Sequence, residues 1–178
     1  MELTRAREIA ERVLALLRPF CVRAEIAGSI RRGKPEVGDI EIVVMPKDEW
    51  FEFRVPGLFD CCEFVINGPR HKKIALADGL DLDLFIVLPP AQWGVIFTLR
   101  TGPAEFSYWI VNRRSCGGRL PSNCRVRDGQ VIRNGEPLPM PEEEDFLRLL
   151  ELEGIAPGER GAQVPLNLYD WHAIGRPA

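Results

Sequence analysis

The chain of 178 residues is 46% hydrophobic, which is enough for one substantial core or for two small lobes packed together. Its net charge of −3 excludes a uniformly basic nucleic-acid binder. No apolar run reaches the length of about 18 residues that predicts a transmembrane helix, and the start lacks the basic-then-apolar pattern of a signal peptide. We therefore expect a cytoplasmic protein with no membrane association. Its five cysteines are expected to be free thiols, because their number is odd and the chain has no export signal, and their spacing does not fit a zinc site.

Hydrophobic periodicity in the first half predicts one helix and several strands. Apolar residues at helical spacing predict a helix over residues 4–18, with Thr4 as its N-cap and Pro19 at its end. Alternation of apolar and polar residues predicts strands over 21–27, 38–45 and 80–88, and weaker strands over 63–66 and 72–77. The strand over 80–88 becomes continuously apolar, which is typical of a central strand, and Pro89-Pro90 marks a boundary after it.

The second half also mixes helix and strand. Residues 91–115 have a helical pattern that breaks in two at Thr101-Gly102-Pro103. A hairpin is expected over 124–134 around Asp128-Gly129, and a helix from Pro141 to about Leu152. The fold class is therefore α+β. We expect a first domain over residues 1–90, a second over 91–160 and a C-terminal tail over 161–178.

Two pairs of carboxylates lie two residues apart on predicted strands. Asp39 and Glu41 point to one face of their strand, and the intervening apolar residues face the core. Asp81 and Asp83 repeat this pattern on a second strand. If the two strands are neighbours, three or four carboxylates converge, and a divalent cation such as Mg²⁺ or Mn²⁺ would relieve their repulsion. The same alternation is typical of surface carboxylates on a one-sided sheet, so the pairs alone leave both interpretations open.

The loop before Asp39 contains the groups that phosphate binding needs. Gly28-Ser29 follows a predicted strand directly, and Ser29 offers a hydroxyl and a backbone N–H to a phosphate. Arg31-Arg32-Gly33-Lys34 adds three positive charges, and Gly38 permits a tight turn. Phosphate donors, basic residues and carboxylates in one short stretch favour metal-assisted phosphoryl transfer.

The segment 28–41, with the sequence GSIRRGKPEVGDIE, resembles the signature of family X DNA polymerases, the group that includes DNA polymerase beta. That signature belongs to the wider polymerase-beta-like nucleotidyltransferase superfamily. The resemblance continues in Leu82-Asp83-Leu84, in the segment 96–102 and in the segments 135–139 and 155–160, so it spans nearly the whole chain. It implies a nucleotidyltransferase palm followed by a small thumb, without the lyase and fingers domains of larger members.

The resemblance also implies roles for individual residues. Asp39 and Glu41 would bridge two metal ions, and Asp83 would join them at the ion that activates a primer 3′-hydroxyl. The residues implied to bind the nucleoside triphosphate are Gly28, Ser29, Arg32, Gly38, Thr101 and Gly102. Within this set, Ser29, Arg32 and Gly38 would hold the β- and γ-phosphates, whereas Thr101 and Gly102 would line the sugar.

Five arginines form a basic stripe with no acid between residues 108 and 127: Arg113, Arg114, Arg119, Arg125 and Arg127. By charge alone, an anion-binding face and an ordinary solvated surface both remain open. The resemblance places the stripe in the thumb, where it would hold a DNA primer-template through its phosphates in a salt-sensitive way. His71, Lys72 and Lys73 could add to such contacts on the palm.

The chain departs from the family pattern at three places. Glu41 stands where the family usually has Asp, Leu99-Arg100 replaces an aromatic pair, and Ser107 stands where an Asn often contacts the base. The leading hypothesis is a DNA polymerase that extends a primer, through template-directed gap filling or repair. The alternatives are a nucleotidyltransferase with a non-DNA acceptor and a catalytically weak nucleic-acid-binding module, which Glu41 favours.

Overall fold

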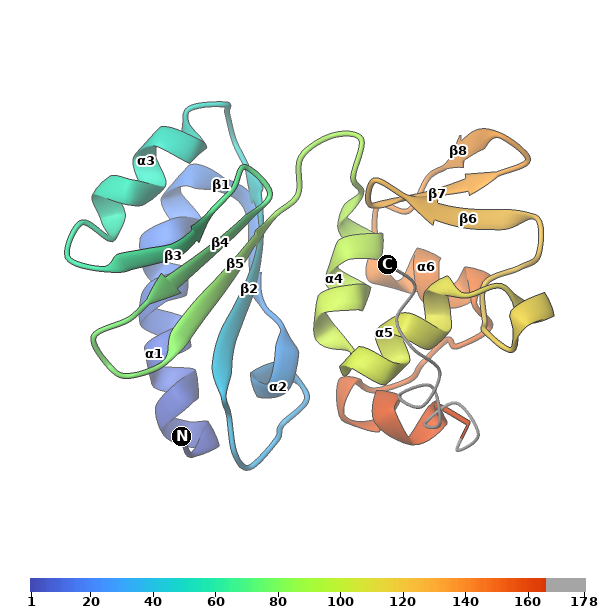
Figure 1. Ribbon diagram of the computed structural model, residues 1–178, viewed down its shortest axis with the longest axis horizontal. Coiled ribbons are helices and arrows are strands. Elements are labelled where there is room, and N and C mark those ends of the chain that lie inside the picture. Colours follow the sequence, from blue (N-terminus) through green and yellow to red (C-terminus); the bar gives the residue numbers. More distant parts are fainter. Residues whose placement is uncertain (166–178) are drawn as a thin grey trace.

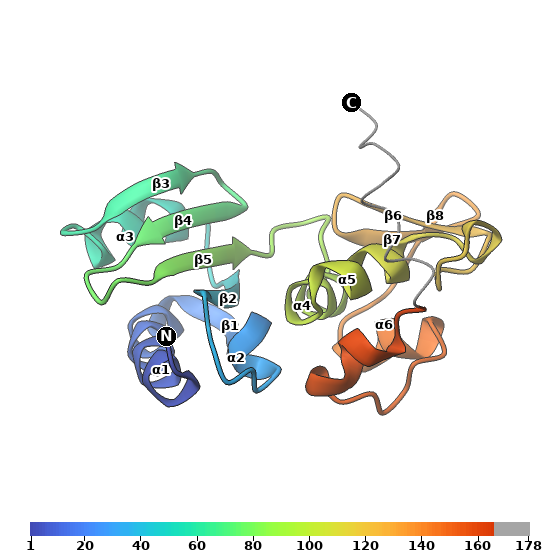
Figure 2. The ribbon, with the colours of Figure 1, turned by 60° about the horizontal axis from the view of Figure 1, so that its bottom comes forward.

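The computed structural model describes residues 1–165, so most of the expected tail, residues 166–178, lies outside the described residues. The fold is α+β, as the hydrophobic pattern predicts: a five-stranded mixed sheet and a three-stranded sheet, each packed with helices. Figures 1 and 2 both show helix α4 between the two sheets. The expected domain boundary at residue 90 falls in the connection that leads into this helix.

The larger sheet has the strand order β1-β2-β5-β4-β3. Its strands are β1 (Cys21–Ile26), β2 (Asp39–Pro46), β3 (Glu63–Asn67), β4 (His71–Ala75) and β5 (Asp81–Ile86). All five were predicted, and β5 is central, as expected. The pair β2 and β5 is parallel, whereas the other neighbouring pairs are antiparallel. The first halves of β2 and β5 therefore lie side by side.

One face of this sheet packs on helices α1 (Leu3–Leu17) and α3 (Phe51–Leu58). Ile40 and Ile42 of β2 and Leu82 and Leu84 of β5 are fully buried there, because alternate residues of a strand share a face. Apolar side chains of α1 at helical spacing, including Ile9 and Leu14, complete the core. The predicted alternation is thus confirmed.

Two local details differ from the sequence-based expectations. Thr4 is not the N-cap of α1; Glu2 occupies that position without a side-chain cap. The start of the helix is fixed by backbone pairing instead, because Glu2 pairs with Glu36 and the Leu3 N–H donates to the Pro35 carbonyl. Helix α3 was not predicted, and its sequence contains Pro56 inside the helix.

The opposite face of the sheet packs on α4 (Trp93–Thr101), and α2 (Gly28–Arg31) contacts β2 with its Ile30 in the core that contains α1. Val43 of β2 and Phe85 of β5 pack there against Trp93 and Phe97 of α4. The carboxylates of β2 and β5 lie earlier on the same face, because they precede these apolar residues by two and four positions. This face therefore changes from acidic to apolar along the strands.

The rest of the chain surrounds a second core. Helix α4 ends at Thr101 and α5 (Ala104–Val111) follows after Gly102-Pro103, which confirms the predicted break. The predicted hairpin forms from β6 (Cys124–Arg127) and β7 (Gln130–Arg133), and an unpredicted strand β8 (Glu136–Leu138) pairs with β7. Helix α6 (Glu143–Leu149) is shorter than expected, and the 3₁₀ helices η1 (Arg18–Phe20), η2 (Arg114–Cys116) and η3 (Pro157–Gln163) complete the chain to residue 165.

All five cysteines are free, as expected. Among residues 1–165, no helix has the length and apolar character needed to cross a membrane.

Candidate active site

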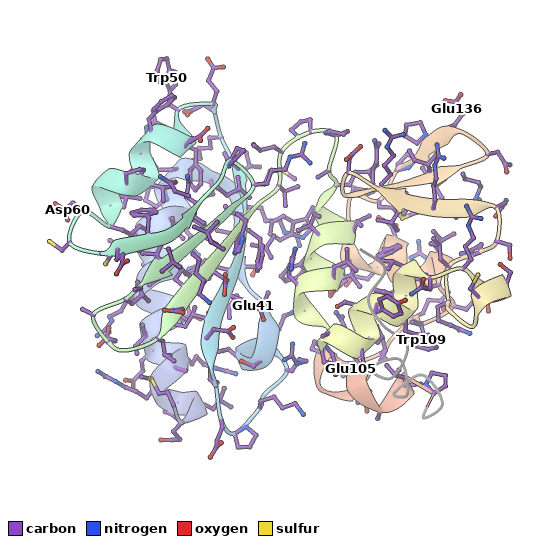
Figure 3. All side chains as sticks on the ribbon, viewed as in Figure 1. Glu41, Trp50, Asp60, Glu105, Trp109 and Glu136 are labelled. Carbon is purple, nitrogen blue, oxygen red and sulfur yellow. The ribbon has the colours of Figure 1, made fainter. Side chains whose placement is uncertain are left out.

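The parallel pairing of β2 with β5 brings the predicted carboxylates together. Asp39 lies opposite Asp81, and Glu41 lies opposite Asp83, so all four project from the same face of the sheet. Asp83 is only 9% exposed, whereas the other three are half-buried. Figure 3 shows Glu41 between β2 and helix α2. The condition for convergence, that the two strands are neighbours, is therefore met.

The electrostatics of the cluster favour binding of a cation. Burial raises the pKa of Glu41 to about 7, and the nearby charge of Asp39 adds to the increase. Burial also raises the pKa of Asp39, with Asp83 as the next cause. Like charges that approach in a partly desolvated site oppose each other's ionisation, and positive charge between them relieves this cost.

Two side chains of β4 contact carboxylates of the neighbouring strand β5. Nζ of Lys73 on β4 lies 3.1 Å from Oδ2 of Asp81 and 3.7 Å from Oδ2 of Asp83. His71, two residues earlier on β4, makes a 2.6 Å hydrogen bond to Oδ1 of Asp83. Because β4 borders β5, alternation along β4 places both side chains on the acidic face.

Arg100 approaches the same carboxylates from helix α4. Its guanidinium lies 3.9 Å from the centre of the Phe85 ring. Desolvation lowers the pKa of Arg100, and the charges of Glu41 and Asp83 act against that decrease, although part of the side chain remains exposed. The sequence marked Arg100 only as a departure from the family pattern; its position against the acidic cluster depends on how α4 packs on the sheet.

Gly28 lies directly against the side chain of Glu41. Its φ of 58° lies in the left-handed region, and a Cβ built on it would overlap the Glu41 carboxylate. The Ala27 N–H donates to the Glu41 carbonyl at 2.8 Å, which holds the loop against β2. The close approach that the sequence attributed to a phosphate is here an approach of the Glu41 carboxylate to the backbone.

The loop that contains α2 has two buried polar atoms without a hydrogen-bond partner among residues 1–165: Oγ of Ser29 and Nε of Arg32. Nη1 of Arg32 donates to the Thr101 carbonyl at 2.8 Å. Burial lowers the pKa of Arg32, with Glu41 and Asp39 opposing the decrease. Buried donors of this kind are costly unless a partner oxygen reaches them, so they are suited to an oxyanion.

Gly38 is open to solvent, whereas packing and hydrogen bonds within the chain surround Thr101 and Gly102. Gly38 is exposed, and a Cβ there would meet open space, so the fold imposes no steric need for glycine. Thr101 is fully buried, and its hydroxyl accepts a 2.7 Å hydrogen bond from Arg31. A Cβ on Gly102 would contact Phe106, so this glycine permits close packing of α4 on α5. The hydroxyl of Ser107 donates to the Leu99 carbonyl at 2.6 Å.

The predicted basic stripe is partly neutralised. Arg114 forms an ion pair with Glu151 at 3.0 Å, and Arg119 donates to the Glu151 carbonyl at 2.7 Å. Arg127 pairs with Asp128, its neighbour in the hairpin, at 3.3 Å. The exposed side chains of Arg113 and Arg125 form no ion pair within the described part of the chain. These two arginines are therefore the most available to an external anion.

The donor set of the cluster suits a hard divalent cation. Asp39, Glu41 and Asp83 offer only carboxylate oxygens, which Mg²⁺ and Mn²⁺ prefer. Among residues 1–165, no group of three or more His, Cys, Asp or Glu side chains is arranged to hold a metal ion. Binding of a metal ion would therefore require a change in at least one of these side-chain positions.

No family model matches the chain, and a search of curated proteins found no match. The function of this chain must therefore be inferred from the residues of its site.

Proposed function

We propose that this chain is a nucleotidyltransferase of the polymerase-beta-like superfamily, and specifically a DNA polymerase that extends a primer 3′-hydroxyl. The observation that carries the proposal is the parallel register of β2 and β5, which sets Asp39 and Glu41 beside Asp83. The buried and unpartnered Ser29 hydroxyl and Arg32 Nε, close to these carboxylates, add support. Carboxylates next to unpaired donors are the arrangement that transfer of a charged phosphoryl group requires.

The reaction follows from these groups. The oxygen of the acceptor hydroxyl forms a bond to the α-phosphorus of a nucleoside triphosphate, and the bond from that phosphorus to the bridging oxygen breaks. Pyrophosphate leaves with the bonding electron pair, and the hydroxyl proton passes to a carboxylate or to water. Asp39, Glu41 and Asp83 would hold Mg²⁺ or Mn²⁺, which when bound neutralises phosphate charge and favours ionisation of the hydroxyl.

The loop at α2 would orient the triphosphate. Ser29 and Arg32 can each donate a hydrogen bond to a phosphate oxygen without losing an internal partner at Oγ or Nε. Arg32 also donates a hydrogen bond to the Thr101 carbonyl. A phosphate bound at Arg32 would therefore contact a side chain that also holds the turn after α4. By the family resemblance, that turn with Gly102 would lie beside the nucleotide sugar.

A DNA primer-template is the proposed acceptor. Arg113 and Arg125 are exposed, and further arginines of the stripe could exchange Glu151 or Asp128 for a phosphate. Such exchange of exposed ion pairs costs little, because each is worth about 0–1 kcal/mol. Binding of this kind would be independent of sequence and weakened by salt.

Primer extension tests this proposal. The chain is incubated with a labelled primer-template, dNTPs and Mg²⁺ or Mn²⁺, and product length is followed on a denaturing gel. We expect template-dependent extension that Asp39→Ala and Asp83→Ala each reduce by more than about 100-fold, since even outer partners of metal ligands change activity 10- to 100-fold. Asp60→Ala is the matched control, because Asp60 lies on an exposed turn far from Glu41 in Figure 3.

Other outcomes would identify the alternatives. Transfer of a nucleotide without any DNA primer, still abolished by Asp39→Ala, would indicate a non-DNA acceptor. Salt-dependent DNA binding with no transfer under either metal would instead indicate a nucleic-acid-binding module and would overturn the proposed activity.

A further inference from the structure

The Asp83 carboxylate is held by a side chain from the neighbouring strand β4. The imidazole of His71 on β4 makes a hydrogen bond from Nε2–H to Oδ1 of Asp83 at 2.6 Å. Asp83 is 13% exposed at its side chain and His71 is 34% exposed, so the contact is largely shielded from water. A short hydrogen bond to a shielded carboxylate is among the stronger side-chain interactions in a protein.

The imidazole ring cannot rotate freely. It stacks on Phe85 with 4.8 Å between ring centroids and an interplanar angle of 11°. His71 and Phe85 are directly opposite in the antiparallel pair of β4 and β5, which sets the two rings face to face. Phe85 also lies against the Arg100 guanidinium, which is 3.9 Å from its ring centre. Strand pairing and stacking therefore fix the direction of the His71 hydrogen bond.

The two oxygens of Asp83 are held unequally. Oδ1 accepts the short hydrogen bond from His71, whereas Oδ2 lies 3.7 Å from Nζ of Lys73. Lys73 is closer to Asp81, at 3.1 Å, so its contact with Asp83 is the weaker of its two ion pairs. A bound ligand could therefore replace Lys73 at Oδ2 without disturbing Oδ1.

We propose that His71 is a positioning residue of the site: by holding Oδ1, it presents Oδ2 of Asp83 to the acceptor side of the reaction. The proposal rests on the proposed function, because Asp83 is assigned to the attacking hydroxyl only there. His71 does not touch the nucleotide or the acceptor. It removes the rotational freedom of a carboxylate that must be in place when the reacting atoms meet, which is the role that outer partners of metal-binding carboxylates have.

Two substitutions separate the hydrogen bond from the packing. His71→Gln keeps an N–H donor at the position of Nε2 and removes the stacked ring. His71→Phe keeps a ring against Phe85 and removes the donor. Thermal melts of both variants identify any loss of folding. Nucleotide transfer gives kcat and KM, and Mn²⁺ titration followed by electron paramagnetic resonance gives metal affinity without nucleotide or primer.

We expect His71→Phe to lower kcat and Mn²⁺ affinity by about 10- to 100-fold with little change in the KM for nucleotide, and His71→Gln to recover most of both. Wild-type values in His71→Phe, or equal losses in the two folded variants, would overturn the positioning role. If the wild type binds Mn²⁺ through Asp83 but transfers nothing, and His71→Phe alone weakens that binding, the role stands and the proposed activity fails. A wild type that neither binds Mn²⁺ nor transfers a nucleotide would overturn both.

Discussion

Glu41 and Gly28 form a matched pair of residues. The left-handed backbone of Gly28 leaves the space that the Glu41 carboxylate occupies, and any side chain at position 28 would overlap it. An aspartate at position 41 would be one methylene shorter and would withdraw from that space. The departure from the usual aspartate is therefore accommodated by the local structure. It does not by itself indicate a site that has lost its function.

Substitutions at this pair should be coupled. Gly28→Ala introduces a Cβ against the carboxylate and costs about 1–2 kcal/mol of backbone strain, so we expect lower thermal stability and a large loss of transfer activity. Glu41→Asp should keep or raise activity, whereas Glu41→Ala should lose it. The double variant Gly28→Ala/Glu41→Asp should regain part of the activity, because the shorter side chain leaves room for the new methyl group. Primer extension and thermal melts measure both effects.

A non-additive result is the signature of direct contact. If Gly28→Ala and Glu41→Asp act independently, the two residues do not share the space that the backbone geometry assigns to them. Equal activity in the wild type, Glu41→Asp and Glu41→Ala would mean that the carboxylate has no part in the reaction.

At the scale of elements, the alternation of apolar and polar residues predicted most of the strands in the large sheet. Asp39 and Glu41 could be placed on one face of β2 because a strand has a period of two, and the same rule placed Asp83 on β5. That β2 and β5 are parallel neighbours could not be read from either strand, because pairing depends on the whole topology. The sequence could therefore predict the convergence of the carboxylates only if the two strands were neighbours, and the structure shows that they are.

Contacts between non-neighbouring segments account for what the sequence did not predict. His71 lies one residue before the weak strand candidate over 72–77, and its partner Asp83 lies on the next strand, so only the register of β4 against β5 joins them. Arg100 reaches the carboxylates through the packing of α4 on the sheet. Charge patterning located the basic stripe correctly in sequence, but it could not reveal that Glu151 pairs with Arg114.

Helix α3 was missed because its stability comes from packing. Its local sequence contains Pro56, which is unfavourable inside a helix, while Phe51 and Val55 are buried against the sheet. Phe51→Ala should lower the free energy of unfolding by about 3–5 kcal/mol, which is the usual cost of truncating a buried phenylalanine. Phe53→Ala is the matched control, because Phe53 is 74% exposed and surface changes cost about 0.5 kcal/mol or less.

Urea denaturation of both variants measures this difference. Similar losses for Phe51→Ala and Phe53→Ala would contradict the assignment of one face of α3 to the core. Circular dichroism of the folded variants would also show whether α3 stays helical without the buried ring.

At the scale of the whole molecule, one buried carboxylate joins elements that are far apart in sequence. Glu143 at the start of α6 accepts two hydrogen bonds from Arg31 of α2, at 2.8 and 2.7 Å, and one from Arg160 of η3 at 3.0 Å. Arg31 also donates to Thr101 at the end of α4. The same connection therefore anchors the proposed phosphate loop and the proposed sugar turn to the second half of the chain.

The charge on Glu143 should make this connection sensitive to pH. Burial acts to raise the pKa of Glu143, but hydrogen bonds and charge from Arg31 and Arg160 outweigh it and lower the pKa. Because the folded pKa is below the unfolded value of about 4.3, the ionised form adds stability above that pH. This contribution is lost as the pH falls through the folded pKa. Glu143→Gln should cost about 3–5 kcal/mol at pH 7, because it leaves the buried Arg160 uncompensated.

Urea denaturation of wild type and Glu143→Gln at pH 7 and pH 3 measures the effect. We expect the difference between their free energies of unfolding to shrink at pH 3, because this pH lies below the unfolded pKa of about 4.3 and the stability from the lowered folded pKa is no longer fully present. Glu144→Gln should change little at either pH, because Glu144 is exposed on the same helix. A difference that stays constant between the two pH values would mean that Glu143 stabilises the molecule through its shape and hydrogen bonds, independently of its charge.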